Sequence, residues 1–82
     1  MVDLSGPIRK LESRVRHHEA IAALDAEAAQ QAGDLIEQGE LRISSRDHAD
    51  QAANYRSAVR ILKSAQEMQL MLRAAEGQER VL

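Results

Sequence analysis

Apolar residues recur at every third or fourth position along two long segments of this chain, and this spacing restricts the fold more than any other feature. In the first segment they run from Ile8 to Leu35 with an average step of about 3.4 residues. The second segment, from Ala52 to Ala75, has the same spacing. A step close to 3.5 is typical of helices that pack along one seam in a left-handed coiled coil. The sequence therefore predicts two amphipathic helices.

Length and composition agree with a small helical protein. The chain has 82 residues, no Cys, and Tyr55 as its single Phe, Tyr or Trp residue. Without Cys, neither a disulfide nor a thiolate metal site can stabilise the fold, so stability must come from packing. Ala, Leu, Glu, Gln and Arg dominate, as in helical chains. We therefore expect an all-α fold in which residues 1–82 form one domain.

Glycine, proline and serine residues suggest where the helices begin and end. Pro7 is acceptable in a first turn, and Gly39 and Gly77 are typical of residues just beyond a last turn. Residues 44–47, Ser-Ser-Arg-Asp, resemble a capping box. These signals predict a first helix over about residues 7–38, a connection at 39–44, a second helix over 45–76 and a frayed tail at 77–82.

The two apolar series match when the chain folds back on itself so that paired residue numbers sum to 83. This antiparallel hairpin lays the acidic stretch 19–41, which has six carboxylates and no Lys or Arg, beside the basic stretch 42–63. It pairs Glu37 with Arg46 and Glu27 with Arg56. The predicted coiled-coil-like core of the hairpin consists of Ile8, Leu11, Val15, Ile21, Leu24, Ala28, Tyr55, Val59, Leu62 and Ala65.

Several large apolar residues remain outside this core. One seam leaves most of each helix in water, while ordering the chain costs on the order of 1.5 kcal/mol per residue. We therefore expect a second interface, with a second copy or with another protein, that completes a four-helix bundle. The residues predicted to form it are Ile36, Ile61, Met68, Leu70, Met71 and Leu72.

The sequence offers few candidates for catalysis or metal binding. His17 and His18 are adjacent, so on a helix they point about 100° apart and cannot close on one ion. His48 is predicted to lie opposite Leu35, far from both. His18 falls on the apolar stripe, where we expect a half-buried imidazole that either finds a hydrogen-bond partner or lies at an interface; a pH-sensitive interface is one option that stays open. No nucleophile lies in a recognisable motif, so we expect no enzyme activity, metal or cofactor.

Four basic residues, Arg9, Lys10, Arg14 and Arg16, surround the single acid Glu12 near the start of the first helix. Such a patch would attract an acidic protein or nucleic-acid phosphates. A net charge of -2 and the lack of stacking aromatics or a phosphate loop disfavour nucleic acid. No apolar run approaches the roughly 18 residues that span a bilayer, and no signal peptide begins the chain, so a cytoplasmic location without membrane contact is expected.

Leu11 and Glu12 near the start of the first helix, Gly39 in the connection and Tyr55 early in the second helix resemble the small co-chaperones of needle subunits in type III secretion. Those proteins are short helical hairpins that act with a second chaperone to keep the needle protein from polymerising. The resemblance covers about residues 8–72. It implies a contact surface on the exposed apolar side of the second helix.

These observations favour a non-enzymatic helical interaction protein, chaperone-like or inhibitory, that holds a helix of another protein. Two alternatives remain open at this point. One is an obligate homodimeric four-helix bundle with a structural or RNA-binding regulatory role. The other is a bacterial phage or mobile-element protein that blocks a host factor.

Overall fold

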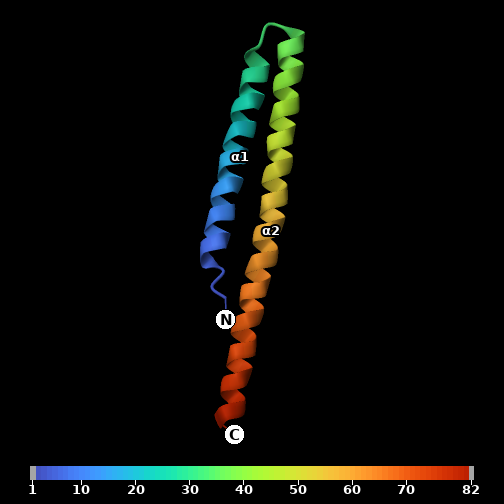
Figure 1. Ribbon diagram of the computed structural model, residues 1–82. Coiled ribbons are helices and arrows are strands. Elements are labelled where there is room, and N and C mark those ends of the chain that lie inside the picture. The colour runs from blue at the N-terminus through green and yellow to red at the C-terminus, as the bar shows by residue number, and fades with distance from the viewer. Residues whose placement is uncertain (1, 82) are drawn as a thin grey trace.

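An antiparallel pair of helices makes up nearly all of the described chain (Figure 1). The computed structural model describes residues 2–81, with side chains as far as Gly77. Helix α1 spans Ser5–Gln31 and helix α2 spans Leu35–Val81. The molecule is a rod of 73 × 14 × 14 Å, close to the length of about 70 Å expected for the 47 residues of α2 alone. The predicted all-helical hairpin is confirmed.

The start of α1 is organised by Asp3. Its Oδ1 accepts hydrogen bonds from the backbone N–H and the hydroxyl of Ser5, at 3.0 and 2.7 Å. These two bonds, with Arg9 nearby, lower the pKa of the Asp3 carboxyl below its ordinary value. The helix therefore begins at Ser5, slightly before the predicted start at residue 7.

The chain turns at residues 32–34. Ala32 leaves the helical conformation with φ of -69° and ψ of 133°. Asp34 then caps α2, because its Oδ1 accepts a hydrogen bond from the backbone N–H of Ile36 at 3.0 Å. Glu37 follows in the first turn, where a negative charge is favourable. The side-chain amide of Gln38 donates to the Ala32 carbonyl at 2.7 Å and so satisfies one carbonyl at the end of α1.

The predicted connection at residues 39–44 is therefore wrong, because these residues lie inside α2. No glycine in the described chain has a positive φ, so Gly39 does not end a helix. Ser44 and Ser45 face α1 instead of capping α2. Their hydroxyls donate to Oδ2 of Asp25 at 2.6 Å and to the Ala22 carbonyl at 2.7 Å.

The second predicted stop, Gly77, also lies inside a helix. The backbone of α2 continues to Val81, so the predicted tail is helical up to that residue. Leu82 lies outside the described residues. Gly in a helix interior costs free energy but does not by itself end the helix when the neighbouring residues favour it.

The seam between the helices follows a strict alternation of three- and four-residue steps. In α1 and the turn its positions are Ile8, Leu11, Val15, His18, Ala22, Asp25, Ala29 and Ala32. In α2 they are Gln38, Leu41, Ser45, His48, Ala52, Tyr55, Val59, Leu62, Gln66 and Gln69. All of these residues are buried or half-buried, and Ala29 and Ala52 are among the most buried, at 2% and 0% exposure.

The pairing register differs from the predicted one by about two heptads. Contacts across the seam join His18 to His48, Asp25 to Ser44 and Glu12 to Lys63, so the residue numbers sum to between 66 and 75 instead of 83. A heptad pattern repeats every seven residues, and moving one helix by two repeats returns the same class of position to the seam. The apolar pattern therefore fits both registers, and the position of the turn separates them.

The predicted core residues fall into three groups. Ile8, Val15 and Val59 are buried, and Leu11, Ile21, Tyr55, Leu62 and Ala65 are half-buried. Leu24, at 65% exposure, and Ala28 are exposed instead of lying in the seam. The prediction followed the larger side chains, whereas the heptad places Asp25 and Ala29 at the seam.

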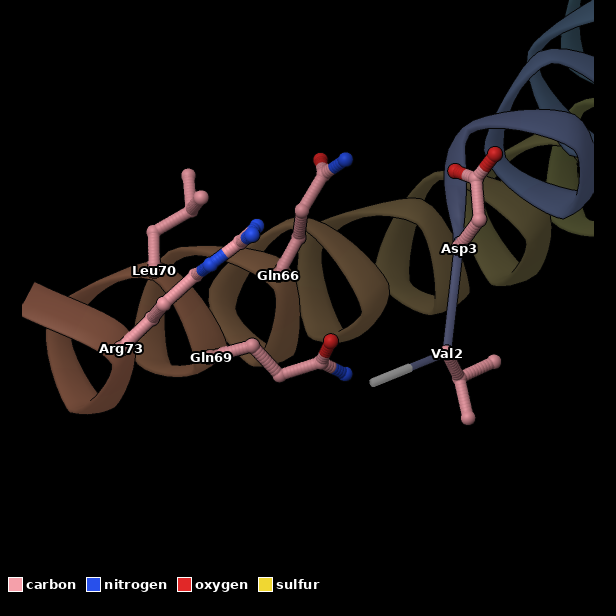
Figure 2. A pocket seen from close by; sticks show the side chains of 6 residues that line it. All are labelled: Val2, Asp3, Gln66, Gln69, Leu70 and Arg73. Atoms are coloured by element: carbon pink, nitrogen blue, oxygen red, sulfur yellow. The ribbon is translucent and has the colours of Figure 1, made fainter. Parts of the chain in front are cut away.

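Helix α2 extends past the start of α1 (Figure 1). Val2 and Asp3 lie beside α2, where together with Gln66, Gln69, Leu70 and Arg73 they line a hollow of about 310 Å³ (Figure 2). Residues 70–77 are all exposed. This end of α2 therefore lacks a covering helix in the single chain.

Candidate interaction surface

A cluster of polar side chains interrupts the seam about halfway along its length. Nδ1 of His18 lies 2.8 Å from Nδ1 of His48, a distance at which one imidazole donates a hydrogen bond to the other. The rings of His18 and Tyr55 are stacked, with centroids 5.6 Å apart, and the Arg14 guanidinium lies 5.6 Å from the Tyr55 centroid. The prediction that His48 lies far from His18 is wrong, because it depended on the register that sums to 83.

The surroundings of His18 favour its neutral form. Desolvation lowers the pKa of His18 below its ordinary value of 6.5, and positive charge on His48, His17 and Arg14 lowers it further. Among residues 2–77, whose side chains the structure describes, no three His, Asp or Glu side chains are placed so that they could hold a metal ion. The hydrogen bond and the ring contacts make this cluster a polar layer of the seam.

Two ion pairs mark one side of the hairpin. Arg56 lies 3.3 Å from Glu19, and Lys63 lies 3.5 Å from Glu12. Each of these four residues directly follows a seam position, so the same flank of both helices meets on this ion-pair side. The predicted partner of Arg56 was Glu27, and the change to Glu19 again follows from the register. Exposed pairs of this kind contribute about 0 to 1 kcal/mol, so they orient the helices more than they stabilise them.

The opposite flank carries several apolar residues that lie outside the seam, in one part of each helix. Ile21 directly precedes the seam residue Ala22 and Leu24 follows it by two positions, and both therefore project to the side away from the ion pairs. Equivalent positions in α2 fall on the same side of the hairpin. We call this surface the apolar side; it consists of Ile21, Leu24, Ala28, Ala58, Ile61, Ala65, Met68, Leu72 and Ala75.

Four of the five large residues of the apolar side are strongly exposed, whereas Ile21 is half-buried. Leu24, Ile61 and Met68 have exposed fractions of 65%, 69% and 63%, and Leu72 has 61%. Single exposed apolar residues are common on soluble proteins, but several large ones gathered on one side are typical of a surface that is covered by a partner. Sequence reasoning missed Leu24 as part of this surface because it had assigned that residue to the core.

The structure brings together some of the predicted interface residues and separates others. Met68, Met71 and Leu72 line one hollow of about 530 Å³ on α2, together with Ser64 and Glu67. Leu70 lies apart from them, in the hollow beside Val2 (Figure 2). Ile36, at 71% exposure, lies next to the turn at the far end of the rod.

The predicted basic patch is divided between the two sides of the hairpin. Arg9 and Arg16 are seven residues apart and share the ion-pair side, whereas Lys10 and Arg14 fall on the flank of the apolar side. All four side chains are exposed. Arg14 is drawn toward the seam by its contact with Tyr55.

The helices and their surfaces define a two-helix antiparallel coiled coil with one apolar side and one ion-pair side. No helix within residues 2–81 is sufficiently long and apolar to cross a membrane. No protein-family model matches the sequence, and neither the curated proteins nor the solved structures contain a match.

Proposed function

We propose that the chain is a non-enzymatic helical protein–protein interaction module, chaperone-like or inhibitory, that holds a helix of another protein on its apolar side. This function agrees with the resemblance to needle-subunit co-chaperones, whose implied contact surface includes the exposed residues of the second helix. The bound helix would complete a bundle around the hairpin.

The observation that carries this proposal is the large surface that the single chain leaves in water. It exposes 6472 Å², whereas a compact protein of 9.1 kDa exposes about 4,900 Å² by the usual scaling of area with mass. The excess of roughly 1,600 Å² is about twice the area that one partner contributes to an interface of standard size. The hairpin thus has room for a partner along much of its length.

The spacing of the exposed residues suits a helix as that partner. A seven-residue interval separates the outer residues of the apolar side on α2, which are Ile61, Met68 and Ala75. The same interval separates the residues next to the seam, which are Ala58, Ala65 and Leu72. This second heptad stripe on α2 matches a helix that packs nearly parallel to it. Met68 and Met71 add flexible side chains that adapt to the partner's surface.

The test is photo-cross-linking at two neighbouring residues that face opposite sides. Benzoylphenylalanine replaces Ile61 on the apolar side or Arg60 on the ion-pair side, in cells that express the chain. We expect the Ile61 position to capture another protein, which mass spectrometry identifies, and the Arg60 position to give little of that product. The captured protein should then bind the purified chain and lose affinity with Met68→Asp. Equal capture at both positions, or none of another protein at Ile61, contradicts the proposal.

A further inference from the structure

We propose that a second copy of this chain covers the apolar side, with the two hairpins reversed so that the turn of one lies at the free end of the other. The inference rests on the proposed function in that both use the apolar side as a binding surface. It adds that the chain's own copy competes for this surface with any other helix.

The apolar side consists of two halves at opposite ends of the rod. Ile21, Leu24 and Ala28 belong to the half of α1 that is close to the turn, whereas the larger residues of α2 follow Ala58 toward the free end (Figure 1). In a reversed pair, the α1 half of each copy meets the α2 half of the other. In a pair with both turns at the same end, Leu24 would face the polar residues Ser44 and Asp47, which lie at its height on α2.

The charged residues on the same flank are unevenly distributed along the rod. Glu37, Glu40 and Asp47 lie toward the turn, whereas Lys10 and Arg14 lie near the middle, where Arg14 contacts Tyr55 of α2. A pair with both turns at the same end would place the three carboxylates of one copy beside those of the other, whereas reversal separates them. Avoiding like charges in this way selects the orientation of a pair. The apolar halves and the acidic residues therefore favour the same two-fold arrangement.

The area available is appropriate for a stable dimer. If each chain buried its excess of roughly 1,600 Å², the pair would bury about 3,200 Å² in total, within the range of obligate homodimers. Such interfaces are also more apolar than transient ones, and the apolar side supplies four large apolar residues that are at least 61% exposed, Leu24, Ile61, Met68 and Leu72.

The oligomeric state of the purified chain tests the inference. We expect sedimentation equilibrium to give twice the monomer mass of 9.1 kDa at micromolar concentrations. Leu24→Asp should raise the dissociation constant at least about tenfold, because pairing would bury a charge. The matched control is Ala23→Asp, an exposed neighbour on the ion-pair side, which should change it less than about twofold.

A monomer mass up to about 100 μM, or equal effects of the two variants, overturns the inference. Loss of helicity in Leu24→Asp together with loss of the dimer supports it, because a residue that is 65% exposed in the single hairpin becomes structural only in the pair.

The reversed orientation has a test of its own. The chain has no Cys, so Leu24→Cys and Met68→Cys each carry a single thiol. After the two variants are mixed and oxidised, we expect the mixed disulfide to exceed both homodisulfides. A predominance of either homodisulfide overturns the reversed arrangement.

These measurements use the purified chain alone, so they separate this inference from the proposed function. A monomer that still captures another protein at Ile61 keeps the function and rejects self-pairing. A dimer that captures only its own copy at Ile61 supports self-pairing and rejects the proposed function.

Discussion

Several polar residues of the seam have a specific partner on the other helix. The Asp25 carboxylate accepts a hydrogen bond from the Ser44 hydroxyl, and the imidazoles of His18 and His48 share a hydrogen bond. No buried side-chain nitrogen or oxygen in the described chain lacks a partner. In the register that sums to 83, Asp25 would face Ala58 and His18 would face Ala65. A buried polar group without a partner costs about 1 to 3 kcal/mol, so these residues select the observed register where the apolar pattern does not.

The polar layer predicts how stability depends on pH. Because the folded-state pKa of His18 lies below its ordinary value of 6.5, the unfolded chain binds the proton more readily. The folded chain therefore has its full stability above about pH 6.5, where His18 is neutral in both states. This contribution to the free energy of unfolding is lost as the pH falls through the lower folded-state pKa of His18. Arg14 and His17 on α1 and His48 on α2 surround the ring, and no carboxylate is among the groups that shift its pKa. We expect the melting temperature, followed by circular dichroism, to fall between about pH 7.5 and about pH 5.5.

Two variants separate His18 from the other histidines. His18→Leu should flatten the pH dependence, because an apolar residue at this seam position does not titrate. His17→Gln, at an exposed neighbouring position, should keep most of it. Equal pH profiles for the wild type and His18→Leu would show that this layer does not control acid stability.

At the scale of the helices, the sequence predicts their number, type and antiparallel arrangement but misplaces the turn. Ser44, Ser45 and Gly39 resemble the end of one helix and the start of the next, yet α2 passes through them. The usable signal was Asp34 followed by Glu37, which has the spacing of a capping box and directly follows Gly33. It could not be preferred from the apolar pattern, because that pattern repeats every heptad and fits either turn.

Asp34→Ala should destabilise the hairpin by about 1 kcal/mol, because the amide of Ile36 loses its capping partner. Denaturant unfolding at a fixed chain concentration measures the change. Asp34→Asn is the control, since its side-chain oxygen still accepts the bond and should retain most of the stability. A turn at residues 39–44 would instead leave Asp34→Ala nearly neutral.

Gly39→Ala gives a prediction of opposite sign. Gly39 lies in the interior of α2, and a Cβ added there meets no other atom within 4 Å. Ala should therefore stabilise the protein by about 0.5 to 1 kcal/mol, through helix propensity. The same unfolding measurement applies. Destabilisation would indicate a left-handed helix end at this residue, as the sequence pattern suggested.

At the scale of the whole molecule, a single hairpin buries few side chains. Among the described residues, five apolar side chains, those of Ile8, Val15, Ala29, Ala52 and Val59, form the buried core. A four-helix arrangement, with another protein or with a second copy, remains the prediction that would bury the rest. The spacing of apolar residues predicted that a surface would be left over. It named Ile61, Met68 and Leu72, which the structure leaves exposed on the apolar side, but not Leu24, which changes from core to surface with the register.

The seam is also unevenly built along the rod. Most of its bulky apolar residues, such as Ile8, Leu11, Val59 and Leu62, lie toward the free end, while Leu41 is joined near the turn by small or polar residues such as Ala22, Ala29 and Ser45. The peptide chain already joins the two helices at the turn. The larger apolar contacts lie at the other end, where no covalent link prevents the helices from separating. Separation of the two helices therefore starts at the free end, and loss of a few bulky seam residues there would expose the start of α1 first, while the hydrogen bonds toward the turn keep the rest of the pair together.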